Sequence, residues 1–212
     1  VAVCGVLAAG MAALLPKLEE VLRDPDQLAG LARFASMAFE AVGFGLADIQ
    51  LMHCDVPEWN HLDGLRIPEA AERVGMEPFE FYARLTVASH RNARVLNHTY
   101  SGDAGDEDAL RAVLAHPLCT IETDTILTAQ GHQNPASFGT FPRVLSTYVE
   151  AGLFSLEEAV RKMTGAAAER LGWSDRGFVR RGAAADLVVF DPARLRDTAS
   201  FEAPSREPEG IE

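Results

Sequence analysis

The sequence predicts an α/β fold, in which helices and strands alternate along the middle of the chain. Two observations carry this prediction. Apolar residues recur at spacings of three and four in several segments, the pattern of amphipathic helices. Between these segments lie short runs rich in β-branched and apolar residues, such as "PLCTIETD" at 117–124, which are typical of strands. Strands that alternate with helices favour a parallel sheet.

In the first half of the chain, a helical pattern runs from Met11 to about Val42, and Asp24-Pro25 interrupts it. A short strand is predicted over 46–54, and a weaker one over 93–100. Between them, the sequence "IPEAAERVGMEPFEFYARL" predicts two helices, because each proline suits the first turn of a helix.

In the second half, acidic residues crowd the start of a predicted helix within 101–116. The strand 117–124 follows, and then a loop rich in Gly, Gln, Asn and Ser. Further helices are expected over 141–172, where Ser155 and Glu158 have the spacing of a capping box. The segment 177–192 predicts a turn and a strand, and the remaining residues are typical of a loop.

Composition excludes several classes of protein. A net charge of −12 without a basic block argues against nucleic acid or an anionic membrane as a partner. Three cysteines without a CxxC pair favour a reducing compartment, so we expect a cytoplasmic protein. No apolar run approaches the roughly 18 residues of a membrane span. The sequence lacks the charged region of a signal peptide. Because it starts without Met and ends at "REPEGIE" without a closing element, we expect a piece of a longer chain.

The strand 117–124 ends in two acids, Glu122 and Asp124. Side chains alternate faces along a strand, so Leu118, Thr120, Glu122 and Asp124 are expected to share one side. In a (β/α)₈ barrel the active site lies at the carboxyl ends of the strands, which is where Asp124 would stand. The alternative is that Asp124 begins a turn, as many aspartates at strand ends do.

Several motifs occur together and in order: "LRAVLAHPLCTIETD", "GTFPRVL", "SLEEAVRKMT" and "ADLVVFDP", preceded by the weaker "GLRIPEAAERVGMEPFEFYARL". In this arrangement the chain resembles the C-terminal portion of the amidohydrolase superfamily, and most closely the D-aminoacylase (N-acyl-D-amino-acid deacylase) family. The resemblance spans roughly residues 45 to 205.

The resemblance implies a division of the chain. Residues 1–175 would be the C-terminal part of a (β/α)₈ (TIM) barrel of a metal-dependent hydrolase. An insertion before the last strand would occupy about 45–115. Residues 176–212 would begin a small β-sandwich appendage.

The resemblance also implies zinc-dependent hydrolysis of a linear amide, namely deacylation of N-acyl-D-amino acids. Asp124 would be the general acid/base acting on a metal-bound water, or a ligand of a second metal. The principal zinc ligands would lie in a part of the protein that precedes this chain. Two alternatives stay open: a cyclic-amide hydrolase of the hydantoinase or dihydroorotase type, and a non-catalytic amidohydrolase-like fragment without the metal.

Three further residues are candidates for substrate binding: Glu122, His132 and Tyr100. Glu122 could equally pair with a basic residue of the barrel. No metal ligands can be assigned within the chain, and the "MHCD" run at 52–55 is interpreted as loop residues without metal. The expected partner is a small N-acyl amino acid, with neither nucleic acid nor membrane, and oligomerisation is left open.

Overall fold

The computed structural model describes residues 15–98 and 107–211. The chain divides into two compact units. Unit 1 comprises Val1–Asp103 together with Gln130–His132, and unit 2 comprises Ala104–Ala129 and Gln133–Glu212. The short return of residues 130–132 to unit 1 bears on the site described below.

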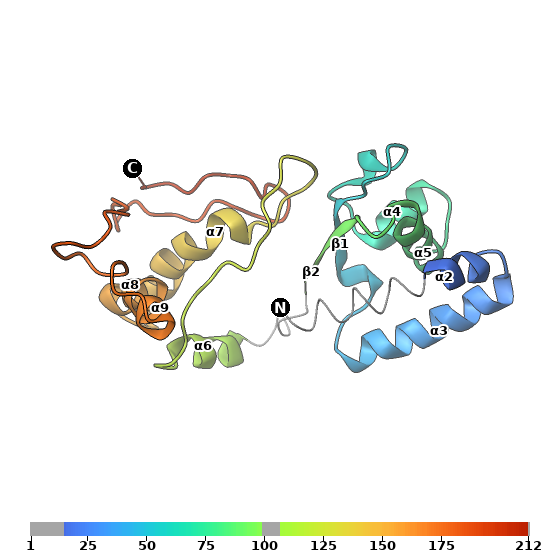
Figure 1. Ribbon diagram of the computed structural model, residues 1–212. Helices are drawn as coiled ribbons and strands as arrows, with labels where there is room; N and C mark the ends of the chain where they lie inside the picture. Colours follow the sequence, from blue (N-terminus) through green and yellow to red (C-terminus); the bar gives the residue numbers. More distant parts are fainter. Residues whose placement is uncertain (1–14, 99–106, 212) are drawn as a thin grey trace. The chain divides into compact units, whose positions relative to one another are not determined.

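Unit 1 combines four helices with a small sheet in its described residues (Figure 1). Asp24 caps the second helix, because its carboxylate accepts hydrogen bonds from the N–H groups of Asp26 at 3.0 Å and Gln27 at 3.2 Å. The predicted break at Asp24-Pro25 and the proline-started helices are therefore confirmed. The elements are α2 (Leu15–Val21), α3 (Pro25–Ala41), β1 (Ile49–His53), α4 (Ile67–Arg73), α5 (Pro78–Ala88) and β2 (Arg94–Asn97).

The sheet of unit 1 is antiparallel, not parallel as predicted. β1 pairs with β2, and it is the one sheet found in the described part of the chain. The register is Leu51 opposite Val95 and His53 opposite Arg94, so Met52 is an extra residue in a β-bulge. This bulge leaves the Met52 carbonyl outside the ladder.

Unit 2 is helical, with α6 (Glu107–Ala115), α7 (Ala136–Arg143), α8 (Leu156–Met163) and α9 (Gly165–Leu171). α7 continues into a π-helical turn over Val144–Tyr148. The predicted cap at Ser155 is confirmed, because its hydroxyl oxygen accepts a hydrogen bond from the Glu158 N–H at 3.2 Å. The predicted strand within 177–192 is wrong for this structure, since only an isolated bridge joins Phe190 to Ile211.

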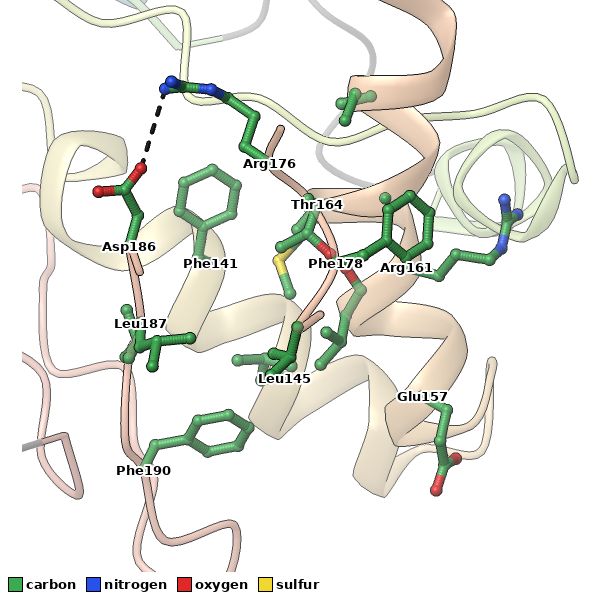
Figure 2. A pocket seen from close by; sticks show the side chains of 18 of the residues that line it. Phe141, Leu145, Glu157, Arg161, Thr164, Arg176, Phe178, Asp186, Leu187 and Phe190 are labelled. Atoms are coloured by element: carbon green, nitrogen blue, oxygen red, sulfur yellow. Dashed lines mark hydrogen bonds and ion pairs between the residues drawn. The ribbon is translucent and has the colours of Figure 1, made fainter. Parts of the chain in front are cut away.

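An apolar pocket of about 940 Å³ lies in unit 2, between α7, α8, α9 and the segment 173–190 (Figure 2). Phe141, Phe178 and Phe190 are among its lining side chains. An ion pair of 3.8 Å between Arg176 and Asp186 stands at its margin. The barrel and the β-sandwich are not visible among the described residues, so these parts of the fold stay predictions.

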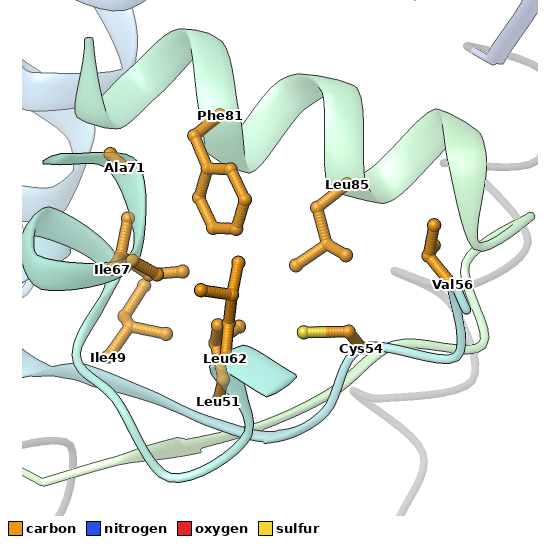
Figure 3. Close-up of a cluster of buried hydrophobic side chains, with 10 residues drawn as sticks. Ile49, Leu51, Cys54, Val56, Leu62, Ile67, Ala71, Phe81 and Leu85 are labelled. Atoms are coloured by element: carbon orange, nitrogen blue, oxygen red, sulfur yellow. The ribbon is translucent and has the colours of Figure 1, made fainter. Parts of the chain in front are cut away.

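The core of unit 1 forms where α4 and α5 cover β1 (Figure 3). Phe81 is fully buried and its ring centroid lies 5.3 Å from that of Trp59. Close packing makes each of these side chains sensitive to truncation. The buried members are Ile49, Leu51, Cys54, Val56, Leu62, Ile67, Ala70, Ala71, Phe81 and Leu85.

Within residues 15–98 and 107–211, no helix has the length and the apolar composition of a membrane span.

Removal of the Phe81 side chain tests whether its packing in the core stabilises unit 1. Removal of an exposed phenylalanine side chain is the control. We expect Phe81→Ala to lower the free energy of unfolding by about 3–5 kcal/mol, because it leaves a cavity. Phe34→Ala, at a side chain 68% exposed on α3, should change it by less than about 0.5 kcal/mol. Denaturant unfolding of both variants checks this, and similar losses would contradict the assigned core.

Candidate active site

Asp124 does not stand at the end of a strand in this structure. Residues 118–128 form an irregular segment, and Asp124 is exposed with a left-handed backbone φ of +39°. Glu122 is exposed as well. The predicted strand over 117–124 is therefore wrong here, because no ladder forms. The predicted alternation is nevertheless present in the exposure of the side chains: Leu118, Thr120, Glu122 and Asp124 are exposed, whereas Cys119, Ile121 and Thr123 are half-buried.

The reason lies in what a strand requires. A strand is stable only when its N–H and C=O groups pair with a neighbour, and no described residue forms such a ladder with 118–128. Three apolar side chains of the segment accordingly remain open to solvent: Leu118 is 67%, Ile126 71% and Leu127 63% exposed. Ile121 is half-buried and packs against the buried cluster of unit 2.

Lys162 holds the start of this segment in place of a ladder. Its side chain is 1% exposed, and Nζ donates to the carbonyls of His116 at 2.6 Å and Cys119 at 3.2 Å. In return, the Ile121 N–H donates to the Lys162 carbonyl at 3.2 Å. Glu158 lies 3.9 Å from the ammonium and supplies the opposite charge. The route of the chain toward Asp124 thus depends on one buried cation.

His132 lies in unit 1, whereas Asp124 and Glu122 lie in unit 2. Its Nε2 is 3.4 Å from Gln50 Nε2, and Gln50 Oε1 is 2.9 Å from His98 Nε2. Gln50 also donates to the Gly64 carbonyl at 2.7 Å, and Arg66 Nη2 lies 3.0 Å from His98 Nδ1. The predicted substrate residue is therefore a member of a partly buried chain of polar groups.

The segment that carries His132 is hydrogen-bonded to β1 at the β-bulge. The His132 N–H donates to the free carbonyl of Met52 at 2.5 Å. Gly131 has φ +73°, and a Cβ there would overlap the Met52 carbonyl oxygen and approach His53 Cβ to 2.8 Å. Only glycine allows this close approach, so the bulge and Gly131 together fix residues 130–132 on β1.

A second polar cluster occupies the end of β1. The Asp63 carboxylate lies 2.9 Å from His53 Nδ1 and accepts from the Cys54 N–H at 2.8 Å. Asp55, with φ +53°, has a carboxylate oxygen 3.8 Å from His53 Nε2. Burial, and then Asp63, raise the pKa of the Cys54 thiol to about 12, which keeps it protonated and unreactive at neutral pH.

The described residues contain no group of three or more His, Cys, Asp or Glu side chains that could hold a metal ion. Tyr100, the remaining predicted substrate residue, lies outside the described residues.

The structural roles of two basic residues, Lys162 and Arg94, were not predicted from the sequence. Lys162 sits in a helix whose neighbours Glu158 and Arg161 are typical of a solvated face, and nothing in its spacing marks it as buried. Arg94 begins the weakly predicted strand β2, and its guanidinium reaches the Gln130 carbonyl from a distant part of the sequence. Only the tertiary contacts reveal either role.

Comparison with known proteins shows which family this chain is similar to. A model of the amidohydrolase family matches residues 139–212. Among curated relatives, the chain is 46% identical over 107 residues to N-acyl-D-aspartate deacylase of Alcaligenes xylosoxydans xylosoxydans, covering 50% of this chain and 21% of that protein. N-acyl-D-glutamate deacylase of the same organism is 43% identical over 110 residues, covering 51% and 22%.

Among solved structures, the chain is similar to D-aminoacylase and to an N-acyl-D-glutamate deacylase. A crystal structure of D-aminoacylase matches with a TM-score of 0.64 and 34% identity, covering 77% of this chain and 32% of that one. N-acyl-D-glutamate deacylase from Bordetella bronchiseptica, complexed with zinc and a phosphonate inhibitor, matches with a TM-score of 0.67 and 32% identity, covering 79% and 33%. The predicted resemblance to the D-aminoacylase family is confirmed. The chain spans about a fifth of the length of the curated relatives it matches.

Removal of the buried ammonium should loosen the segment before Asp124. We expect Lys162→Met to cost about 1–3 kcal/mol, because two carbonyls lose their donor. Arg161→Met is the matched control on the same helix: its ion pair with Glu158 and its long hydrogen bond of 3.4 Å to the Pro117 carbonyl are both partly open to solvent, and the ion pair is worth less than about 1 kcal/mol. Chemical denaturation measures both, and equal losses would contradict the role of Lys162.

The close approach at Gly131 can be tested against a glycine in open space. Gly43 shares the left-handed conformation, with φ +83°, but a Cβ there meets nothing within 4 Å. Both Gly131→Ala and Gly43→Ala strain the backbone, and only the first also overlaps β1. We expect Gly131→Ala to cost about 1–3 kcal/mol more in free energy of unfolding. Losses of the same size would mean that residues 130–132 are not seated on the bulge.

Proposed function

We propose that this chain is part of a zinc-dependent amidohydrolase that removes the acyl group from N-acyl-D-amino acids. The observation that carries the proposal is 43–47% identity, over about half of the chain, to three deacylases: those named for N-acyl-D-aspartate and N-acyl-D-glutamate, and a D-aminoacylase. Two of these names specify an N-acyl-D-amino acid, whose acyl group is held by a linear amide, and this supports the proposed reaction.

Asp124 is the proposed general acid/base. Hydrolysis requires that water attack the amide carbonyl, that the C–N bond break, and that the water's proton reach the leaving nitrogen. A carboxylate can take this proton during attack and return it to the amine, so that a carboxylic acid and an amino acid are released. Asp124 suits this role because it is exposed and because no hydrogen bond or ion pair within the described residues commits its oxygens.

Zinc would polarise the amide carbonyl and lower the pKa of the attacking water when bound. We place the principal zinc ligands in another part of the full-length protein, as the resemblance to the D-aminoacylase family implies. The chemistry proposed for this chain is limited to proton transfer by Asp124.

Glu122 and His132 are proposed to contact the substrate. Glu122 is exposed two residues before Asp124. His132 is held by the Gln50–His98 chain of polar groups, which fixes the position of its ring. An imidazole fixed in this way can donate a hydrogen bond to an oxygen of an N-acyl amino acid.

Replacement of Asp124 tests the proposal. In the full-length protein, Asp124→Asn should lower kcat for an N-acetyl-D-amino acid by about 10²–10⁴, because an amide cannot carry the proton. Its zinc content, measured by atomic spectroscopy, should equal that of the wild type. The matched control is Asp108→Asn, an exposed acid on α6, which should retain activity. Turnover by Asp124→Asn at the wild-type rate would end the assignment.

A further inference from the structure

Arg94 carries a donor that the described protein leaves without an acceptor. Its Nη2 donates to the Gln130 carbonyl at 2.8 Å. Its Nη1 is buried and has no hydrogen-bond partner. A buried N–H that loses water without gaining an acceptor costs about 1–3 kcal/mol, and more when the group is charged. Buried donors of this kind in native proteins call for an explanation, such as a bound ion.

A guanidinium N–H is a cationic donor, and its strongest acceptors are anions. The chain is acidic overall, with 31 acidic against 19 basic residues, yet no ion pair joins Arg94 to a carboxylate of the described residues. The acids nearest in the ladder are already committed. Arg94 lies opposite His53, whose ring is flanked by Asp63 at 2.9 Å and Asp55 at 3.8 Å.

The same surroundings define which anion. Asp55 and Asp63 flank His53, the residue opposite Arg94 in the ladder, and their charges disfavour a doubly charged phosphate more than a single negative charge. A planar carboxylate matches the guanidinium fork and brings only one charge. The backbone around Arg94 is also fixed, because Gly131 and His132 seat the Gln130 segment on the Met52 bulge. The donor is thus held in place before any ligand arrives.

We propose that Arg94, with Nη2 held by the Gln130 carbonyl, binds the carboxylate of a small monoanionic molecule through Nη1. The site lies at the junction of β1, β2 and residues 130–132, within unit 1. It needs neither Asp124 nor zinc, so it stands or fails separately from the proposed hydrolysis.

Unit 1 supplies a matched control. Arg66 is also partly buried, and its Nη1 donates to the Ala47 carbonyl at 2.9 Å, as Arg94 does to Gln130. Its second arm differs, because Nη2 lies 3.0 Å from His98 Nδ1. The two arginines thus share burial and a carbonyl acceptor, and differ in whether the other arm has a partner.

The test is ligand-observed saturation-transfer NMR on the full-length protein, with sodium acetate titrated at constant ionic strength. We expect saturable binding to the wild type, a Kd raised at least about tenfold by Arg94→Gln, and a Kd changed less than about twofold by Arg66→Gln. Arg94→Lys keeps the charge but loses the fork, so it should fold and bind more weakly than the wild type.

Three results would overturn the proposal: no saturable acetate binding, equal binding by Arg94→Gln and Arg66→Gln, or equal displacement of acetate by chloride and acetylglycine. Circular dichroism of each variant establishes that it is folded. If Arg94→Gln does not fold, the comparison of Arg94→Lys with Arg66→Lys decides, and equal affinities of those two variants reject the site.

Discussion

The route of the chain to its proposed catalytic acid depends on the buried ammonium of Lys162. Nζ satisfies the carbonyls of His116 and Cys119, and the Lys162 carbonyl accepts from the Ile121 N–H. These bonds do locally what a β-ladder would do along a strand: they satisfy backbone groups and fix the path of 116–121. A buried cation tolerates this role because Glu158 and two carbonyl dipoles face it. After this point exposed and half-buried side chains alternate, and Asp124 is one of the exposed ones.

The elements that the sequence predicted well are those whose signals are local. Asp24 caps α3, Ser155 caps α8, and prolines begin α4 and α5, so a few neighbouring residues determine each helix start. The strands predicted over 46–54 and 93–100 are confirmed as β1 and β2, but those predicted over 117–124 and within 177–192 are wrong, although their local signals were equally clear. Residues 117–124 have the apolar pattern of a strand, but pairing is a property of two segments, and the described chain offers no second one. The antiparallel partner of β1 was likewise beyond any local pattern.

The candidate site likewise has residues that the sequence predicted and residues whose roles only the structure shows. Asp124 was identified from motifs in order along the chain, and the resemblance on which it rests is confirmed by relatives and solved structures. The roles of Lys162 and Arg94 could not be predicted in this way, because a sequence pattern does not distinguish a buried basic side chain from an exposed one. The seat of His132 depends on a bulge and a glycine some 80 residues apart in sequence. Contacts of that range exist only in the folded chain.

The central claim is that this chain contributes Asp124 to a zinc enzyme that deacylates N-acyl-D-amino acids. The most direct measurement is amine release by the zinc-analysed full-length protein from N-acetyl derivatives of aspartate, glutamate and leucine, each as D and L enantiomers, beside dihydrouracil as a cyclic amide. If this proposal holds, the protein binds zinc and releases amine from D substrates at rates well above those for their L counterparts. Opening of the cyclic amide alone, or zinc-loaded protein that releases no amine from any D substrate, would contradict it.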